Sequence, residues 1–177
     1  MRIISGKYKG RHIRVHQKFS ARPTTDFAKE NLFNFLGNYF DFTKTSVLDL
    51  FAGTGSMSYE FASRGCPVIE LVEIDFKSFS FIKKIIQELQ ITSIIPYLTD
   101  AYKYIRHCRN QYDLIFADPP YRDEKIAELP ELIIKQDVLK PKGWFILEHS
   151  GKNDFSDQMN FKEKRTYGSV NFSVFSK

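Results

Sequence analysis

Short hydrophobic runs alternate with helical stretches along most of the chain, and this alternation limits the possible folds more than any other feature. The expected strands are residues 46–50, 68–74, 94–98, 113–117 and 143–148, and the expected helices are 56–64, 76–89, 101–108 and 124–138. Such alternation predicts a mostly parallel sheet with helices on both faces. We therefore expect a doubly wound α/β fold.

The end of the chain departs from this alternation. Residues 160–166 and 170–176 are strand-like and are joined by a Tyr-Gly-Ser turn, which predicts an antiparallel hairpin at one edge of the sheet. With 177 residues, of which 42% are hydrophobic, the chain is long enough to build one full core without disulfides or metals. Trp144 and Phe145 lie on an expected strand and are interpreted as core residues.

The beginning of the chain has a pattern of its own. Two strand-like segments, 2–5 and 11–15, flank a Gly-Lys-Tyr-Lys-Gly turn and predict a hairpin. Thr24 or Thr25 can then cap a helix whose broad apolar stripe packs on the main body. The expected division is a hairpin-and-helix extension over residues 1–40 and an α/β domain over residues 41–177.

Positive charge is concentrated near the N-terminus. The net charge is +5, yet residues 1–25 contain seven basic residues and no acid, so the other 152 residues carry 19 bases against 21 acids. The seven are Arg2, Lys7, Lys9, Arg11, Arg14, Lys18 and Arg22. A cationic arm on a near-neutral body indicates salt-sensitive contact with nucleic-acid phosphates, with Lys7, Lys9 and Arg11 at its turn. The alternative is a solvated, charged hairpin without a ligand.

Export, membrane spans and metal sites have no support in the sequence. Cys66 and Cys108 are far apart and lack a CxxC pairing, and the four histidines lack metal-ligand spacing. The N-terminus is charged where a signal peptide needs an apolar region, and the longest hydrophobic runs have strand length. We expect a cytoplasmic protein without a metal.

Ligands of doubly wound sheets bind beyond the carboxyl ends of the strands, so each strand-to-helix junction is a candidate site. The first junction ends in a Gly-x-Gly turn, where missing Cβ atoms let the backbone approach a ligand. A dinucleotide site would have a third glycine where this chain has Ser58, which disfavours nicotinamide and flavin. Asp49 instead indicates a cationic group, such as the amino group or sulfonium of S-adenosylmethionine. A tight turn without a ligand is the alternative. The candidate cofactor residues here are Asp49, Phe51, Gly53, Thr54 and Gly55.

Two further junctions carry acidic residues. Glu73 lies 18 residues beyond Gly55, near the spacing at which a carboxylate can hold a ribose diol. Asp75 opens the next expected helix and is predicted to be its N-cap. Asp100 could accept a hydrogen bond from an adenine amine or cap the helix that follows, and both interpretations stay open. The candidate cofactor residues at these two junctions are Glu73, Ile74, Asp100 and Ala101.

The fourth junction has the most specific pattern, Asp118-Pro119-Pro120-Tyr121 after a hydrophobic strand. An exocyclic base amine is a poor nucleophile because its lone pair is delocalised into the ring. Hydrogen bonds to the Asp118 carboxylate and the Pro119 carbonyl would aim that lone pair at a methyl donor. Tyr121 would stack on a base extruded from its helix. The alternative is a Pro-Pro strand terminus with an incidental aspartate. These four residues are the catalytic candidates.

The motifs resemble a known family. The segments 49–55, 72–75 and 118–121 are similar to motifs of the class I S-adenosylmethionine-dependent methyltransferases that modify amines. The N-terminal block narrows the resemblance, because Arg2-Ile-Ile-Ser-Gly-Lys-Tyr-Lys-Gly-Arg, Arg22-Pro-Thr-Thr-Asp and Glu30-Asn-Leu-Phe resemble the RsmD-type 16S rRNA guanine-N2 methyltransferases. The resemblance covers nearly the whole chain.

This resemblance implies a Rossmann-like domain of seven strands, the last antiparallel, and an N-terminal hairpin that contacts RNA. It also implies S-adenosylmethionine as cofactor, a guanine of 16S rRNA as substrate, and a monomer that acts on the small ribosomal subunit or a late assembly intermediate. Arg22 and Thr24 of the N-terminal block join the expected RNA contacts. The chain departs from the family by Lys29, where an arginine is usual, and by Thr54, Met57 and Ser58 in the cofactor turn and its helix.

Three other functions deserve comparison. Adenine-N6 methylation of DNA or RNA shares the 118–121 motif, but it usually brings a larger target-recognition segment for which this chain has no room. A non-catalytic nucleic-acid-binding or cofactor-binding module would be expected to lose Asp118 or the glycine turn, and both are present. A nicotinamide oxidoreductase is least favoured, since Ser58 replaces a glycine and no proton donor stands beside the turn.

Overall fold

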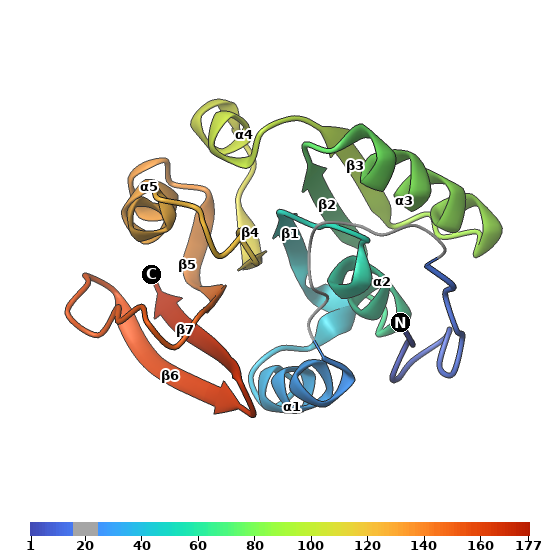
Figure 1. The fold of residues 1–177 in the computed structure, drawn as a ribbon, viewed down its shortest axis with the longest axis horizontal. Coiled ribbons are helices and arrows are strands. Elements are labelled where there is room, and N and C mark those ends of the chain that lie inside the picture. Colours follow the sequence, from blue (N-terminus) through green and yellow to red (C-terminus); the bar gives the residue numbers. More distant parts are fainter. Residues whose placement is uncertain (16–24) are drawn as a thin grey trace.

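A computed structural model describes residues 1–15, called the N-terminal arm below, and residues 25–177; it contains one seven-stranded sheet (Figure 1). The strands are β1 (Ser46–Leu50), β2 (Val68–Glu73), β3 (Ile94–Leu98), β4 (Tyr112–Ala117), β5 (Leu139–His149), β6 (Phe161–Tyr167) and β7 (Val170–Ser176). Their order across the sheet is β3-β2-β1-β4-β5-β7-β6. Strands β1 to β5 are parallel, and β7 is antiparallel to β5 and β6. The predicted fold, including the antiparallel last strand, is confirmed.

Helices cover both faces of the sheet. One face packs against α1 (Asp26–Leu36), α2 (Ser56–Ser63) and α3 (Phe76–Glu88), and the other packs against α4 (Ala101–His107) and α5 (Leu129–Lys135). Side chains of a strand alternate between the two faces. On β4, Leu114 and Phe116 accordingly belong to the first core, and Ile115 and Ala117 belong to the second. The sheet therefore separates two hydrophobic layers and positions the strand ends between them.

The segment before β5 differs from its prediction. Instead of one helix over residues 124–138, it contains a 3₁₀ turn, η2 (Ile126–Glu128), followed by the short α5. Pro130 stands in the first turn of α5, where the missing proline N–H breaks no helical hydrogen bond. Asp137 has a φ of 55°, which a helix cannot accommodate. The helix prediction was therefore wrong in its extent.

The N-terminal arm doubles back as the predicted hairpin and packs against α2, but its strands are much shorter than predicted. The Ile3 amide donates to the Arg11 carbonyl at 3.1 Å, and the Ile13 amide donates to the Met1 carbonyl at 3.0 Å. Within the described residues of the arm, a single bridge joins Arg2 and His12. The backbone amides of Ile4 and Ser5 donate to the carboxylate of Glu60 on α2, at 2.8 and 3.1 Å. The hairpin prediction is confirmed, and the predicted strand lengths were wrong because the Glu60 carboxylate holds the amides of Ile4 and Ser5.

Helix α1 begins where the sequence predicts, since the Thr25 side chain caps it by accepting from the Ala28 amide at 3.1 Å. Its apolar side chains pack into the same core as Ile3 and Ile13 of the arm. The buried apolar residues of α1 are Ala28, Leu32, Phe33, Phe35 and Leu36. Phe27, near the start of the same helix, is exposed although the sequence predicts its apolar side chain to pack on the main body. The arm and α1 thus share the core that covers one face of the sheet.

Candidate active site

The carboxyl ends of β1, β2 and β4 meet at one edge of the sheet (Figure 1). Leu50 at the end of β1 is in register with Val72 on β2 and with Ala117 on β4. The next residues along these strands, including Glu73 and Asp118, therefore emerge at the same edge. The structure brings together the three junctions that the sequence places far apart.

The turn after β1 has a backbone shape that requires its glycines. Gly53 and Gly55 have φ values of 56° and 79°, in the left-handed region that favours glycine. A Cβ at Gly55 would lie 2.8 Å from the ring of Tyr59. Phe51 has a φ of 57°, a strained value for a side chain of this size. Its ring packs edge-on against the ring of Tyr102, with 5.8 Å between the ring centroids. Strain of this kind is typical of functional sites.

Glu73 holds this turn. Its carboxylate accepts from the Gly53 amide at 2.6 Å and from the Asp75 amide at 2.7 Å. Burial raises the pKa of Glu73, and the two hydrogen bonds oppose that rise. Asp75 caps α3 by accepting from the Ser78 amide at 2.7 Å, which confirms the cap prediction.

Asp49 is buried at the end of β1 with one oxygen satisfied and one not. Its Oδ2 accepts from the Ser58 hydroxyl at 2.5 Å, whereas its Oδ1 is buried without a hydrogen-bond partner among the residues that the structure describes. Burial raises the pKa of Asp49 to about 7. A buried acceptor without a donor costs free energy unless a ligand supplies the donor. A cationic amino group fits this requirement.

Asp118 follows β4 and lies among other carboxylates. Burial raises its pKa well above the ordinary value, and the negative charges of Glu148 and Asp49 raise it further. Glu148 is buried near the end of β5, where the neighbouring pair Ala117 and Leu147 are in register. Like charges at short range disfavour ionisation, so this site favours a positively charged ligand.

The residues after Asp118 lie at the surface of the site. Pro119 is buried, Pro120 is exposed, and Tyr121 is 62% exposed. Ile74, beside Glu73, is 65% exposed. Exposed aromatic and aliphatic side chains at a strand edge offer flat apolar surface to a ligand.

The remaining cofactor candidates have structural partners. Asp100 caps α4 by accepting from the Lys103 amide at 2.8 Å, which confirms one of its two interpretations. Ala101 is buried in the first turn of α4. The Thr54 hydroxyl donates to the Met1 sulfur at 3.7 Å, so the glycine turn touches the N-terminal arm.

The arm lysines lie away from the carboxylates. Lys7 and Lys9 are exposed, and the Lys7 amide donates to the Ser63 carbonyl at 2.7 Å, at the far end of α2 from the glycine turn. Helix α2 has eight residues and is about 12 Å long. The structure therefore does not bring these lysines next to Asp118. Arg22 and Thr24 lie outside the described residues.

The sequence did not predict the roles of three residues in this region. Ser58 was interpreted as a lost glycine, but its hydroxyl is the partner of Asp49. Glu148 was not singled out, although an acid near the end of an apolar strand was a usable signal. Lys29 is buried and donates from Nζ to the Arg2 carbonyl at 2.7 Å and to the Ser56 hydroxyl at 3.2 Å. It links the arm to the first turn of α2.

Two negative observations concern the described part of the chain. No group of three or more His, Cys, Asp or Glu side chains within residues 1–15 and 25–177 is arranged to hold a metal ion. None of the helices described there has the length and apolar character needed to span a bilayer.

The sheet order and the strand-end site define a class I methyltransferase fold. The structure superposes on "Putative methyltransferase yhhF from Escherichia coli" with a TM-score of 0.88 at 24% identity, covering 100% of this chain and 97% of that one. The family model "Conserved hypothetical protein 95" matches residues 1–176.

Curated relatives extend over the same length. "Putative rRNA methyltransferase YlbH" of Bacillus subtilis (strain 168) is 34% identical over 100% of this chain and 99% of its own length. "Ribosomal RNA small subunit methyltransferase D" of Buchnera aphidicola subsp. Baizongia pistaciae is 33% identical over 84% of this chain and 75% of its own length. The chain belongs to this family, the RsmD-type S-adenosylmethionine-dependent methyltransferases, as the sequence motifs predict.

Proposed function

We propose that this protein transfers a methyl group from S-adenosylmethionine to the exocyclic N2 amine of a guanine in 16S rRNA. The observation that carries the proposal is the half-buried carboxylate of Asp118, which precedes Pro119-Pro120-Tyr121 at the same sheet edge as the glycine turn. The names of the relatives YlbH and methyltransferase D support rRNA as the class of substrate.

The residues at the ends of β1 and β2 fit the cofactor. The unsatisfied Oδ1 of Asp49 would accept from its amino group, and the Glu73 carboxylate would accept from its ribose hydroxyls. When bound, S-adenosylmethionine supplies an electrophilic methyl group on a positively charged sulfur. The other proposed cofactor contacts are Phe51, Gly53, Thr54, Gly55, Ile74, Asp100 and Ala101.

The Asp118 segment would prepare the amine for attack. The Asp118 carboxylate and the Pro119 carbonyl would accept hydrogen bonds from the two N–H groups, which directs the nitrogen lone pair toward the donor. The exposed ring of Tyr121 would stack on the guanine, and Pro120 fixes the direction of this segment. A carboxylate with a raised pKa is also a suitable acceptor for the proton that the amine must lose.

Positive ligand charge would complete this site. Without such a ligand, the negative charges of Glu148 and Asp49 raise the pKa of Asp118. A cation beside these carboxylates favours their ionised forms, and the ionised Asp118 is both the stronger acceptor for the amine N–H groups and the only form that can take up the proton the amine loses. Binding of the cofactor would therefore convert Asp118 to its active form.

The N-terminal arm would hold the RNA backbone. Lys7, Lys9 and Arg11 are exposed and suit contacts to phosphates, as would Arg22 and Thr24 outside the described residues. We propose a monomer acting in the cytoplasm on the small ribosomal subunit or on a late assembly intermediate.

The test is transfer of a labelled methyl group from S-adenosylmethionine to unmodified small subunits, bare 16S rRNA and DNA in parallel, with nucleoside mass analysis. N2-methylguanine on the subunit or its RNA is the expected product. N6-methyladenine would overturn the choice of base, and product on DNA alone would overturn the choice of nucleic acid. Absence of transfer would instead favour a binding module.

A further inference from the structure

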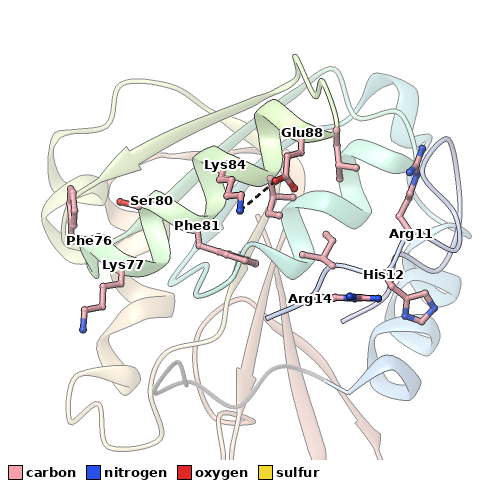
Figure 2. A pocket seen from close by; sticks show the side chains of 12 residues that line it. Arg11, His12, Arg14, Phe76, Lys77, Ser80, Phe81, Lys84 and Glu88 are labelled. Carbon is pink, nitrogen blue, oxygen red and sulfur yellow. Dashed lines mark ion pairs between the residues drawn. The ribbon is translucent and has the colours of Figure 1, made fainter. Parts of the chain in front are cut away.

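A groove of about 730 Å³ lies between α3 and the N-terminal arm, outside the cluster of carboxylates described above. Figure 2 shows Lys77 and Lys84 on α3 and Arg11 and Arg14 on the arm around the same space. None of the cofactor or catalytic candidates lines it. The groove is therefore distinct from the candidate active site.

The lining of this groove is strongly cationic. Four permanent positive charges face one acid, Glu88, and Glu88 is already paired with Lys84 at 3.6 Å. Within the described residues, Arg11, Arg14 and Lys77 form no ion pair. Unpaired cations gathered in a concave surface concentrate positive potential there, which attracts a polyanion.

The α3 wall presents one face of a regular helix. Lys77, Phe81, Lys84 and Glu88 recur at intervals of three or four residues, and side chains with this spacing project on the same side. Lys83 of the same helix is absent from the groove lining and lies 5.9 Å from the ring of Phe79. Lys83 is therefore a comparable lysine of the same helix that lies outside the groove lining.

The groove begins at the candidate active site. Helix α3 starts at Phe76, directly after the cap Asp75, whose amide donates to Glu73. Phe76 is 68% exposed and lines the end of the groove nearest this junction. From there α3 extends for 13 residues, or about 20 Å, and Arg11 lies on the opposite wall.

We propose that this groove binds the phosphodiester backbone of the RNA strand that flanks the target nucleotide, with Phe76 stacking on a base at the active-site end. The inference rests on the proposed function and deepens it. Single-stranded nucleic acid is typically held by a cationic channel combined with exposed aromatic rings, and the groove contains both. It would lead the strand from the target base toward the arm, because α3 connects those two regions.

The decisive variant replaces Lys77 and Lys84 with glutamine, which removes two charges and keeps the helix formers. The control replaces Lys83, which does not line the groove, and the exposed Lys152 in the same way. Binding of both variants and the parent to bare 16S rRNA is measured between 50 and 300 mM KCl, a range of about sixfold in salt. Affinity for S-adenosylmethionine and the unfolding midpoint are measured in parallel.

The groove variant is expected to lose at least tenfold in RNA affinity at low salt. The slope of log K against log [salt] should decrease by about 2, since each lost phosphate contact removes about 1. Its cofactor affinity and unfolding midpoint should match those of the parent, and the control should keep the parental slope.

Three outcomes would overturn the inference. An unchanged slope in the groove variant, with a parent that methylates rRNA, would reject the groove and leave the proposed function intact. Parental binding to bare rRNA, with transfer lost only on protein-containing subunits, would assign the groove to an acidic protein segment. A parent that neither binds nor methylates rRNA would overturn the proposed function and the groove together.

Discussion

The carboxylate of Glu73 accepts a hydrogen bond from the amide of Gly53 at 2.6 Å, so the end of β2 fixes the turn that follows β1. The same carboxylate accepts from the Asp75 amide and thereby fixes the start of α3. Glu73 therefore holds together two motifs that are separated by 20 residues in the chain. Any ligand that reaches Glu73 must share its oxygens with these two amides.

Glu73→Gln tests these hydrogen bonds. Glutamine retains one oxygen acceptor but turns an amide donor toward a backbone N–H group, so one hydrogen bond is lost. We expect the free energy of unfolding to fall by about 1–3 kcal/mol, because a buried hydrogen bond to a charged group is removed. We also expect at least tenfold weaker binding of S-adenosylmethionine by calorimetry. Glu88→Gln on exposed α3 surface serves as the control. Lower stability with unchanged cofactor affinity would limit Glu73 to a structural role.

Asp118→Asn tests the proposed catalytic carboxylate. The substitution keeps the size of the side chain and removes the charge that would hold the target amine. We expect methyl transfer to fall by at least a thousandfold, while S-adenosylmethionine binds within about threefold of the parent. Glu131→Gln, on the exposed side of α5, is the matched control. A large loss of cofactor affinity in the Asp118 variant would contradict its assignment to the amine.

The pH dependence of transfer offers a second check on Asp118. In the free protein its pKa is raised by burial and by two neighbouring carboxylates, and only the ionised form can take up the proton that the amine loses. The rate should therefore fall as the pH decreases through this raised pKa, well above the ordinary range of an aspartate, by tenfold per pH unit. Rates at subsaturating S-adenosylmethionine between pH 5 and 9, which report the free protein, would show this acidic limb. A rate that stays constant down to pH 5 under these conditions would exclude a raised pKa of Asp118 in the free protein.

The sequence was sufficient to predict the sheet, because each βα unit has a local signature: an apolar run, a turn and a helix. It also predicted which junctions meet, since parallel strands bring their carboxyl ends to one edge. The caps at Thr25 and Asp75 were equally local, as each bonds within three residues of itself.

Interactions between distant segments could not be predicted in this way. The Ser58 hydroxyl donates to Asp49, and the Glu60 carboxylate accepts from the amides of Ile4 and Ser5 in the arm. These hydrogen bonds join residues that only the folded backbone brings together. Glu148 influences Asp118 through the register of β4 and β5. The groove between α3 and the arm likewise joins residues that are more than sixty positions apart in the chain.

Asp49→Asn should separate cofactor binding from stability. Burial raises the pKa of Asp49 to about 7 from an ordinary value of 3.8, so the folded protein holds a proton between these values that the unfolded chain releases. The free energy of unfolding should therefore decrease as pH rises from about 4 to 7, and the variant should lose this part of the slope. Denaturant unfolding at several pH values measures the difference.

Cofactor binding should respond to pH in the opposite direction. Only the ionised Asp49 can pair with an amino cation, so affinity of the parent should fall by up to about tenfold per unit below pH 7. The variant should bind at least tenfold more weakly at pH 8 and show less pH dependence. Ser58→Ala removes the hydroxyl that donates to Asp49 and should therefore raise the pKa of that carboxyl. The pH at which cofactor affinity is half-lost should rise accordingly. Parental affinity in Asp49→Asn would remove this residue from the cofactor site.

Lys29→Met tests the link between the arm and α2. The ammonium group is buried and donates to the Arg2 carbonyl and the Ser56 hydroxyl, and methionine fills a similar volume without a donor. We expect a loss of about 1–3 kcal/mol in the free energy of unfolding, because the two acceptors lose their partner. Faster amide exchange at Ile3 and Ile13 should accompany it. The exposed Lys44→Met should change neither quantity, and slow exchange in the Lys29 variant would show that the arm is held by other contacts.

Neutralising the turn of the arm tests its proposed contact with RNA. Lys7, Lys9 and Arg11 are exposed and lie apart from the carboxylate site, so their replacement by alanine should leave cofactor affinity unchanged. Binding to bare 16S rRNA should weaken, and the slope of log K against log [salt] should decrease by about 2 to 3, because each phosphate contact contributes about 1. The control triple variant replaces Lys44, Lys142 and Lys152 with alanine. Equal slopes in the two triple variants would mean that the arm charges serve solvation alone, and the basic N-terminus would then have no part in substrate binding.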